Sequence, residues 1–156
     1  LIVFIVDRPR HKHLIQEVRQ AGARVFLRSS GDVGGALLAA DAVGHVDAMM
    51  GTGGVAEGLM TACAVKALGG GMLGRVSPQS QDERQACIDG GLDLEKVLTC
   101  DDMIKGEEIF FSATGVTGGF LLRGVNYHGD WVDTHSLVLR FETGTRRIIT
   151  TEHRIK

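Results

Sequence analysis

The chain has 156 residues, of which 44% are hydrophobic and 23% charged, a composition typical of a compact domain and not of a disordered or fibrous segment. Its formal net charge of −2 argues against nucleic acid as a partner, because a polyanion is normally bound by a strongly basic face. Apolar runs fall well short of the roughly 20 residues that span a bilayer, so we expect no membrane association and a cytoplasmic protein.

Glycine is the residue type in excess. The sequence contains 22 glycines and 2 prolines, whereas usual shares are about 7% and about 5%. The glycines cluster between apolar runs without a three-residue period, so the clusters are candidate ligand loops and not a collagen-like repeat. The 3 cysteines are widely spaced and form no Cys-x-x-Cys pair, which predicts reduced thiols instead of a disulfide framework or a zinc site.

Three successive strand-helix units are predicted in the first part of the chain. Residues 1–6 form a continuous apolar run rich in β-branched side chains, which is typical of a central parallel strand covered on both faces. Further strands are expected at 25–27 and 46–50, and helices at 14–21, 33–40 and 55–68, with Asp32 as a cap of the second helix. Such units predict a parallel sheet with right-handed crossovers.

The remaining chain has a different pattern. We expect a polar surface helix over residues 79–90 and a short turn through residue 104, capped by Asp101 and Asp102. Strands are predicted at 109–113, 121–125, 132–141 and 147–151. The fold class is therefore α/β, with three βα units around a parallel sheet followed by a mostly antiparallel strand region. Because the sequence opens inside an apparent buried strand, we expect it to be part of a longer protein.

The loops after the first three strands are predicted to share one edge of the sheet, where open α/β sheets bind ligands. The first loop is Asp-Arg-Pro-Arg-His at residues 7–11. Its two arginines on a proline-stiffened turn suit a phosphate or carboxylate, but equally suit a solvated turn. His11 and His13 are two residues apart, which does not place two ligands on one helical face; we interpret both as surface or loop histidines.

The second and third loops contain carboxylates beside helix starts. Ser-Ser-Gly-Asp at 29–32 offers hydroxyls, a glycine and a carboxylate, a pattern that more often caps a helix than builds a site. Gly-Thr-Gly-Gly-Val-Ala-Glu-Gly at 51–58 resembles turns whose backbone approaches phosphate, yet matches neither the dinucleotide nor the P-loop pattern. Glu57, in the first helical turn, suits the helix dipole or a divalent metal, and the dipole is the commoner role for an isolated glutamate.

Other candidates are weaker. Ser112 and Thr114 are not surrounded by a nucleophile elbow, and we interpret them as a hydroxyl-rich strand end. Tyr127 and Trp131 are too few to form a stacking platform for bases, and we expect them to pack in the core or at its rim.

Taken in order, these segments resemble a known family. The motifs Asp-Arg-Pro-Arg-His, Gly-Asp-Val, Met-Gly-Thr-Gly-Gly-Val-Ala-Glu-Gly, Phe-Ser-Ala-Thr-Gly-Val-Thr and Leu-Leu-Arg-Gly-Val resemble those of the class II fructose-1,6-bisphosphatases, including their fructose/sedoheptulose bisphosphatase relatives. The likeness covers nearly the whole chain. It implies a layered sugar-phosphatase-type fold and hydrolysis of the 1-phosphate of a ketose bisphosphate with Mg²⁺ or Mn²⁺. It also implies a homodimer or tetramer and a role in gluconeogenesis, glycerol metabolism or the Calvin cycle.

The resemblance also assigns roles to individual positions. It implies Glu57 as a metal ligand, and it implies substrate binding by seven residues: Arg8, Pro9, Arg10, Ser30, Gly31, Asp32 and Gly54. The chain departs from the family at Ser30, where an aspartate is common, and at Val55 and Ala56, where alanine and proline are common. Members of the family often have an acidic residue near Gly118, and this chain has none at that place.

The resemblance is to the C-terminal part of proteins about twice as long. It implies that residues 1–156 are the sugar-phosphate-binding part, that an N-terminal metal-binding part lies outside this sequence, and that this chain contains no catalytic residue. We therefore expect the chain alone to be inactive, because one glutamate does not hold a catalytic metal pair. A truncated, noncatalytic sugar-phosphate-binding module is the alternative. A nucleotide-binding Rossmann-like domain has little support, because Arg28 and Ser29 stand where a ribose-binding acidic residue is expected.

Overall fold

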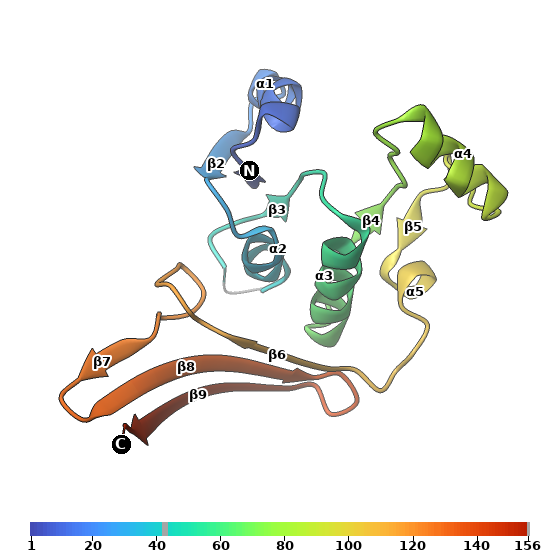
Figure 1. Ribbon diagram of the computed structural model, residues 1–156. Helices are drawn as coiled ribbons and strands as arrows, with labels where there is room; N and C mark the ends of the chain where they lie inside the picture. The colour runs from blue at the N-terminus through green and yellow to red at the C-terminus, as the bar shows by residue number, and fades with distance from the viewer. Residues whose placement is uncertain (42–43, 156) are drawn as a thin grey trace.

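The computed structural model describes residues 1–41 and 44–155 of the chain. Figure 1 shows a small parallel sheet, a curved antiparallel sheet below it, and helices between and beside them. The predicted fold class is confirmed, since a parallel three-stranded sheet is combined with antiparallel strands in a mixed α/β arrangement. Among the described residues, the helices are too short or too polar to cross a membrane.

The first three strands alternate with helices as predicted. Strand β1 (Ile2–Val6) pairs in parallel with β2 (Arg24–Arg28) on one side and β3 (Ala48–Met49) on the other, so β1 is central. A 3-10 turn, η1 (Pro9–His11), precedes the first of three helices. These helices are α1 (Lys12–Gln20), α2 (Asp32–Ala40) and α3 (Val55–Ala67).

Strand β1 is buried on both faces, which explains its unbroken apolar sequence. Val3 and Ile5 pack on one face against α1, together with Ile15 and Val18. Phe4 and Val6 point to the opposite face, where Phe4 is 0% exposed. Because successive side chains of a strand point to opposite faces, a strand covered on both sides has no position left for a polar residue.

Helix α2 approaches β1 closely because it carries glycines. A Cβ at Gly35 would lie 2.4 Å from the ring of Phe4, and a Cβ at Gly34 would lie 3.0 Å from the ring of Phe120. The two rings meet edge to face with centroids 5.4 Å apart. The predicted cap is wrong: Gly31, at φ 103°, is the N-cap, and Asp32 is the first helical residue. The chain reverses there through the left-handed region that favours glycine.

A small lateral unit follows α3. Strands β4 (Leu73–Gly74) and β5 (Leu98–Thr99) form an antiparallel pair that the sequence did not predict. Helix α4 (Gln81–Asp89) matches the predicted polar helix, and α5 (Cys100–Met103) matches the predicted turn.

The cap of α5 differs from the prediction. Thr99 is the N-cap, and its hydroxyl accepts a bond from the Asp102 amide. The Asp102 carboxylate in turn accepts from the Thr99 amide at 3.0 Å and from Lys96 at 3.1 Å. These bonds favour the charged form and lower the pKa of Asp102 to about 2.

The three cysteines are free thiols. Cys100, the first residue of α5, is buried, and this desolvation raises the pKa of its thiol.

The second half forms an antiparallel sheet around one long strand. Strand β8 (Trp131–Arg140) pairs with β6 (Phe110–Thr114) and β7 (Asn126–His128), and on its other side with β9 (Thr145–Arg154). Tyr127 and Trp131 are 73% and 42% exposed, so they belong to the rim and not to the core.

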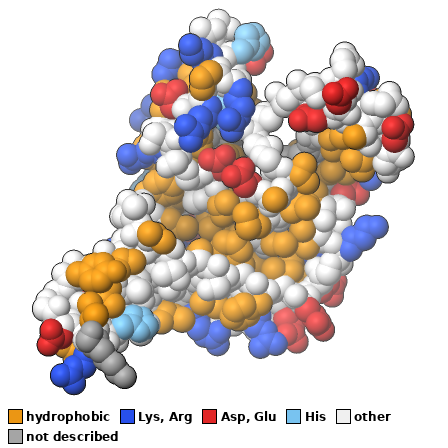
Figure 2. Space-filling model, in the orientation of Figure 1, with side chains coloured by type: hydrophobic (Ala, Val, Ile, Leu, Met, Phe, Trp, Pro, Cys, Tyr) orange, Lys and Arg blue, Asp and Glu red, His pale blue; other side chains and the backbone are white. Residues whose placement is uncertain are grey.

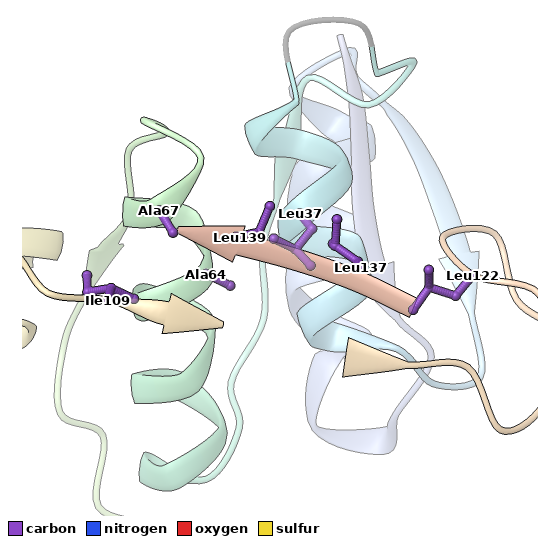
Figure 3. Close-up of a cluster of buried hydrophobic side chains, with 7 residues drawn as sticks. All are labelled: Leu37, Ala64, Ala67, Ile109, Leu122, Leu137 and Leu139. Carbon is purple, nitrogen blue, oxygen red and sulfur yellow. The ribbon is translucent and has the colours of Figure 1, made fainter. Parts of the chain in front are cut away.

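The antiparallel sheet shares a core with α2 and α3. Figure 3 shows Leu137 and Leu139 of β8 facing Leu37 of α2 and Ala64 and Ala67 of α3. Leu139 and Ala64 are 0% exposed. The small side chains of α3 let the helix lie close to the sheet, and the two halves of the chain are thereby packed into one unit.

The predicted strand at residues 121–125 is wrong. This segment belongs to a glycine-rich loop whose two arms touch each other: the Val125 amide donates to the Val116 carbonyl at 3.1 Å. A Cβ at Gly115 would lie 2.1 Å from the carbonyl oxygen of Arg123. The Leu122 carbonyl and the Val125 amide are thus bonded inside the loop, whereas the Arg123 amide donates to His135 of β8 at 3.0 Å. Leu122 itself reaches the core.

We expect Gly35→Ala to destabilise the fold, because its methyl group would overlap the buried Phe4 ring. Overpacking of this kind costs about 1–3 kcal/mol. Gly58→Ala is the control, since a Cβ there meets nothing within 4 Å and alanine favours a helix interior by about 0.5–1 kcal/mol. Urea denaturation measures both, and a Gly35→Ala variant as stable as Gly58→Ala would contradict the packing described.

Candidate active site

The three loops predicted to share an edge do lie together at the carboxyl ends of the parallel strands. The sheet order β2-β1-β3 places β1 between strands whose connections run in opposite directions. Ligands of open α/β sheets bind at such a point. The first loop follows β1, the second precedes α2, and the third joins β3 to α3.

His11 fastens the first loop to the third. Its side chain is 2% exposed, so His11 lies in the loop between β1 and α1 as one of the two interpretations had it, but it is not a surface histidine. Nδ1 lies 2.7 Å from the Val6 carbonyl, and the Thr52 amide donates to Nε2 at 2.9 Å. A carbonyl needs a donor and an amide needs an acceptor, so one neutral tautomer, with the proton on Nδ1, satisfies both bonds.

Arg10 adds a second link between the same loops. Its Nε donates to the Thr52 carbonyl at 2.7 Å, which uses one of the five N–H donors of a guanidinium. Arg8 and Arg10 are exposed and flank Pro9, which begins the 3-10 turn. Arg8 and Arg10 are thus held at the sheet edge, on a turn that the hydrogen bonds of His11 keep in place.

Two carboxylates face each other across the third loop. A Cβ at Gly53 would lie 3.5 Å from Oε2 of Glu57 and 3.8 Å from Oδ2 of Asp32. The distance between Oε2 of Glu57 and Oδ2 of Asp32 is therefore at most the sum of these two distances. Both residues stand in the first turn of a helix, α2 for Asp32 and α3 for Glu57. The absence of a side chain at Gly53 keeps the space between the two carboxylates open.

Glu57 stands in the first turn of α3, as expected for a residue that favours the helix dipole, and it also makes a capping bond that the sequence analysis did not predict. Its Oε2 accepts a bond from the Gly54 amide at 3.2 Å, as in a capping box. A carboxylate has two oxygens and about four lone-pair sites, so this bond leaves acceptor capacity. The capping bond is therefore compatible with a metal bond at the same carboxylate.

The donors at this edge fit a divalent cation only in part. Mg²⁺ prefers oxygen ligands and is often held by one or two carboxylates together with waters and substrate phosphates. Asp32 and Glu57 supply two carboxylates, but within residues 1–41 and 44–155 no group of three His, Cys, Asp or Glu side chains converges. The chain therefore contains part of a fitting ligand set.

The second loop is shaped by a residue that the sequence analysis did not single out. Phe120, from the glycine-rich loop after β6, would touch a Cβ at Gly31 at 3.2 Å. Ser30, the residue before Gly31, is exposed. The contact joins residues that are far apart in the sequence. The only local sign of it was a lone aromatic residue in a glycine-rich segment.

The weaker candidates lie on the antiparallel sheet. Thr114 and Ser136 share a hydrogen bond of 2.8 Å between β6 and β8. Thr114 is thus part of a cross-strand pair, in agreement with its interpretation as a strand-end hydroxyl.

Comparison with known proteins assigns the family. The family described as "Bacterial fructose-1,6-bisphosphatase, glpX-encoded" matches residues 1–153. The chain belongs to this family. The resemblance found in the sequence motifs is thereby confirmed.

Two curated relatives of this chain carry the same name. A protein of Trichodesmium erythraeum (strain IMS101), named D-fructose 1,6-bisphosphatase class 2/sedoheptulose 1,7-bisphosphatase, is 38% identical over 98% of the chain and 48% of its own length. A protein of the same name from Synechocystis sp. (strain ATCC 27184 / PCC 6803 / Kazusa) gives the same three values. The chain therefore spans about half the length of the curated relatives it matches.

We expect His11→Phe to destabilise the protein, because it leaves the Val6 carbonyl and the Thr52 amide without their partner. Each unsatisfied buried group costs about 1–3 kcal/mol. His13→Phe is the matched control, since His13 is exposed and pairs with Glu17 on the surface of α1; surface changes stay within about 0.5 kcal/mol. Thermal unfolding compares the two, and equal effects would contradict the role of His11.

Proposed function

We propose that the chain is the sugar-phosphate-binding part, residues 1–156, of a divalent-metal-dependent phosphatase. The substrate would be fructose 1,6-bisphosphate, and also sedoheptulose 1,7-bisphosphate, with the 1-phosphate removed. The observation that supports this most directly is the meeting of the arginine loop with the Asp32 and Glu57 carboxylates at one sheet edge. The names of the Trichodesmium and Synechocystis relatives support the substrate class.

The arginine loop would bind the phosphate that is retained. A guanidinium forms charge-assisted and bidentate bonds with phosphate, and Arg8 and Arg10 stand on either side of Pro9. Because Arg10 is anchored to Thr52, the phosphate would be held at a fixed distance from the third loop. Binding energy from this remote group would orient the scissile phosphate.

The second and third loops would position the sugar. Asp32 accepts hydrogen bonds, and sugar hydroxyls donate them; Ser30 and Gly31 place this carboxylate at the start of α2. Gly54 would contact the substrate where a glycine backbone permits close approach. These residues bind and orient the substrate, and the proposal assigns none of them a part in bond cleavage.

Glu57 would be a metal ligand for Mg²⁺ or Mn²⁺. Such an ion, when bound, polarises a phosphoryl oxygen and activates water. The hydrogen bond from the Gly54 amide would hold the Glu57 carboxylate in place. Asp32 would contribute a second negative charge from the facing helix α2. Because two carboxylates are an incomplete set, the other ligands would come from outside this chain, and the chain alone would be inactive.

The proposal extends to the biological setting. The whole protein would act in carbohydrate metabolism, in gluconeogenesis, glycerol metabolism or the Calvin cycle, as a cytoplasmic homodimer or tetramer. The second candidate is a noncatalytic module that binds sugar phosphates without metal. The incomplete ligand set among the described residues fits this alternative as well as the first proposal, so metal dependence of binding separates the two.

We expect Arg10→Ala to weaken binding of fructose 1,6-bisphosphate by about 10-fold or more, because a hydrogen bond to a charged group contributes about 1.5–3 kcal/mol. Arg19→Ala is the control, since Arg19 is an exposed arginine on α1. Isothermal titration calorimetry measures both variants without metal. Equal affinity of the two variants would argue against the arginine loop as the phosphate site.

We expect Mn²⁺ to strengthen binding of the same ligand to the wild-type chain, and Glu57→Gln to remove this effect. Glutamine retains an oxygen that can accept from the Gly54 amide, so the cap of α3 is kept while the negative charge is lost. Glu17→Gln on α1 controls for a general loss of charge. Binding unaffected by Mn²⁺ would favour the noncatalytic module, and phosphate release by the isolated chain would refute its predicted inactivity.

A further inference from the structure

The segment that joins β3 to α3 contains little that would keep its own backbone in one conformation. Residues 51–54 read Gly-Thr-Gly-Gly, and glycine loses more conformational freedom on folding than any other residue. Thr52, the one residue of the segment with a side chain, is exposed. Yet Arg10 is bonded to Thr52, and Glu57 is bonded to Gly54. The conformation of the segment therefore decides where both of these side chains lie.

His11 is the buried side chain that holds this segment. Its Nδ1 lies 2.7 Å from the carbonyl of Val6, the last residue of the buried strand β1, and its Nε2 accepts from the Thr52 amide at 2.9 Å. A Cβ at Gly51 would lie 3.3 Å from the His11 ring, so the glycine lets the imidazole come close. The imidazole thus links the rigid end of β1 to the backbone of Thr52.

The backbone of Thr52 in turn orients Arg10. Its carbonyl accepts from Arg10 Nε at 2.7 Å, which leaves the terminal nitrogens of the guanidinium as donors. Figure 2 shows basic side chains gathered over the part of the molecule that holds the parallel sheet, and acidic side chains just below them. Among residues 1–41 and 44–155, the ion pairs nevertheless do not include Arg10, Asp32 or Glu57. A neutral carbonyl thus binds Arg10 without neutralising its charge.

We propose that His11 is a positioning residue, which orients the Arg10 guanidinium toward a phosphate group by fixing the backbone of Thr52. The proposal rests on the proposed function, because that function assigns the retained phosphate to Arg10. Without the bond to His11, the Thr52 amide would turn among its glycine neighbours, and the Thr52 carbonyl would move with it. Arg10 would then lose the acceptor that orients it. A phosphate would have to order both groups on binding, at a cost in affinity.

A purely structural role of His11 would depend on both ring nitrogens alike, because each satisfies a backbone group. Two substitutions separate the two bonds. The amide of asparagine reaches the place of Nδ1, so His11→Asn can keep the bond to the Val6 carbonyl but loses the bond to Thr52. The amide of glutamine reaches the place of Nε2, so His11→Gln can accept from the Thr52 amide but loses the bond to Val6. Positioning through Thr52 predicts that only His11→Asn affects Arg10.

The first measurement needs no ligand. The heteronuclear NOE of an arginine Nε–H group, measured by NMR, reports motion on the ps–ns timescale. In the wild-type chain Arg10 should be ordered, whereas Arg19, an exposed arginine of α1, should be mobile. His11→Asn should make Arg10 as mobile as Arg19, and His11→Gln and the surface control His13→Gln should leave it ordered. Equal mobility of Arg10 and Arg19 in the wild type, or equal effects of His11→Asn and His11→Gln, would overturn the proposal.

The second measurement is calorimetric titration with fructose 6-phosphate, which carries only the phosphate that Arg10 would bind. His11→Asn should weaken binding about 10-fold or more, as the loss of a hydrogen bond to a charged group does. His11→Gln and His13→Gln should bind it nearly as the wild type does, and equal weakening by the two His11 variants would contradict the proposal. Expected order of Arg10 without any binding to the wild type would contradict the proposed function, while the positioning of Arg10 by His11 would stand.

A second site tests the same contact if His11→Asn does not fold, which circular dichroism establishes. Gly51 is exposed, and a methyl group there would push the His11 ring away by a few tenths of an ångström. Gly51→Ala should therefore make Arg10 more mobile. Gly58→Ala is the control, since its Cβ meets nothing within 4 Å. Unchanged order of Arg10 in a folded Gly51→Ala chain would overturn the proposal.

Discussion

The burial of β1 on both faces is the constraint on which the rest of the structure depends. Phe4 fits against α2 because Gly35 leaves room for its ring, and Val3 and Ile5 pack against α1 on the opposite face. A strand covered in this way must have a neighbour on either edge, and the order β2-β1-β3 follows. That order brings the loops after β1 and β3 together, and the candidate active site lies where they meet.

Most of the first half and much of the second could be predicted because their signals are local. A continuous apolar run, helical spacing and glycine stops each act over a few residues, and they located β1, α1 and α3. The error at residues 121–125 has a physical origin. Leu121 and Leu122 are as apolar as strand residues. The glycines of this loop, however, let its two arms bond to each other. Burial of apolar side chains alone does not distinguish such a loop from a strand.

The site was predictable at the level of its loops but not of its internal bonds. The edge rule for parallel sheets selected the loops that contain Arg10, Asp32 and Glu57. The role of His11 depends on the Thr52 amide, which is 41 residues away in sequence, and the histidine therefore looks like any polar loop residue. Asp32 and Glu57 likewise become a pair only through the glycine between them.

Helix α3 combines two features, one at its first turn and one along its exposed side. Its first turn holds a carboxylate that faces a second carboxylate, and the two helix N-termini offset part of their repulsion through favourable dipoles. Its next turns expose an apolar stripe. A divalent cation bound between the two carboxylates would neutralise the facing charges.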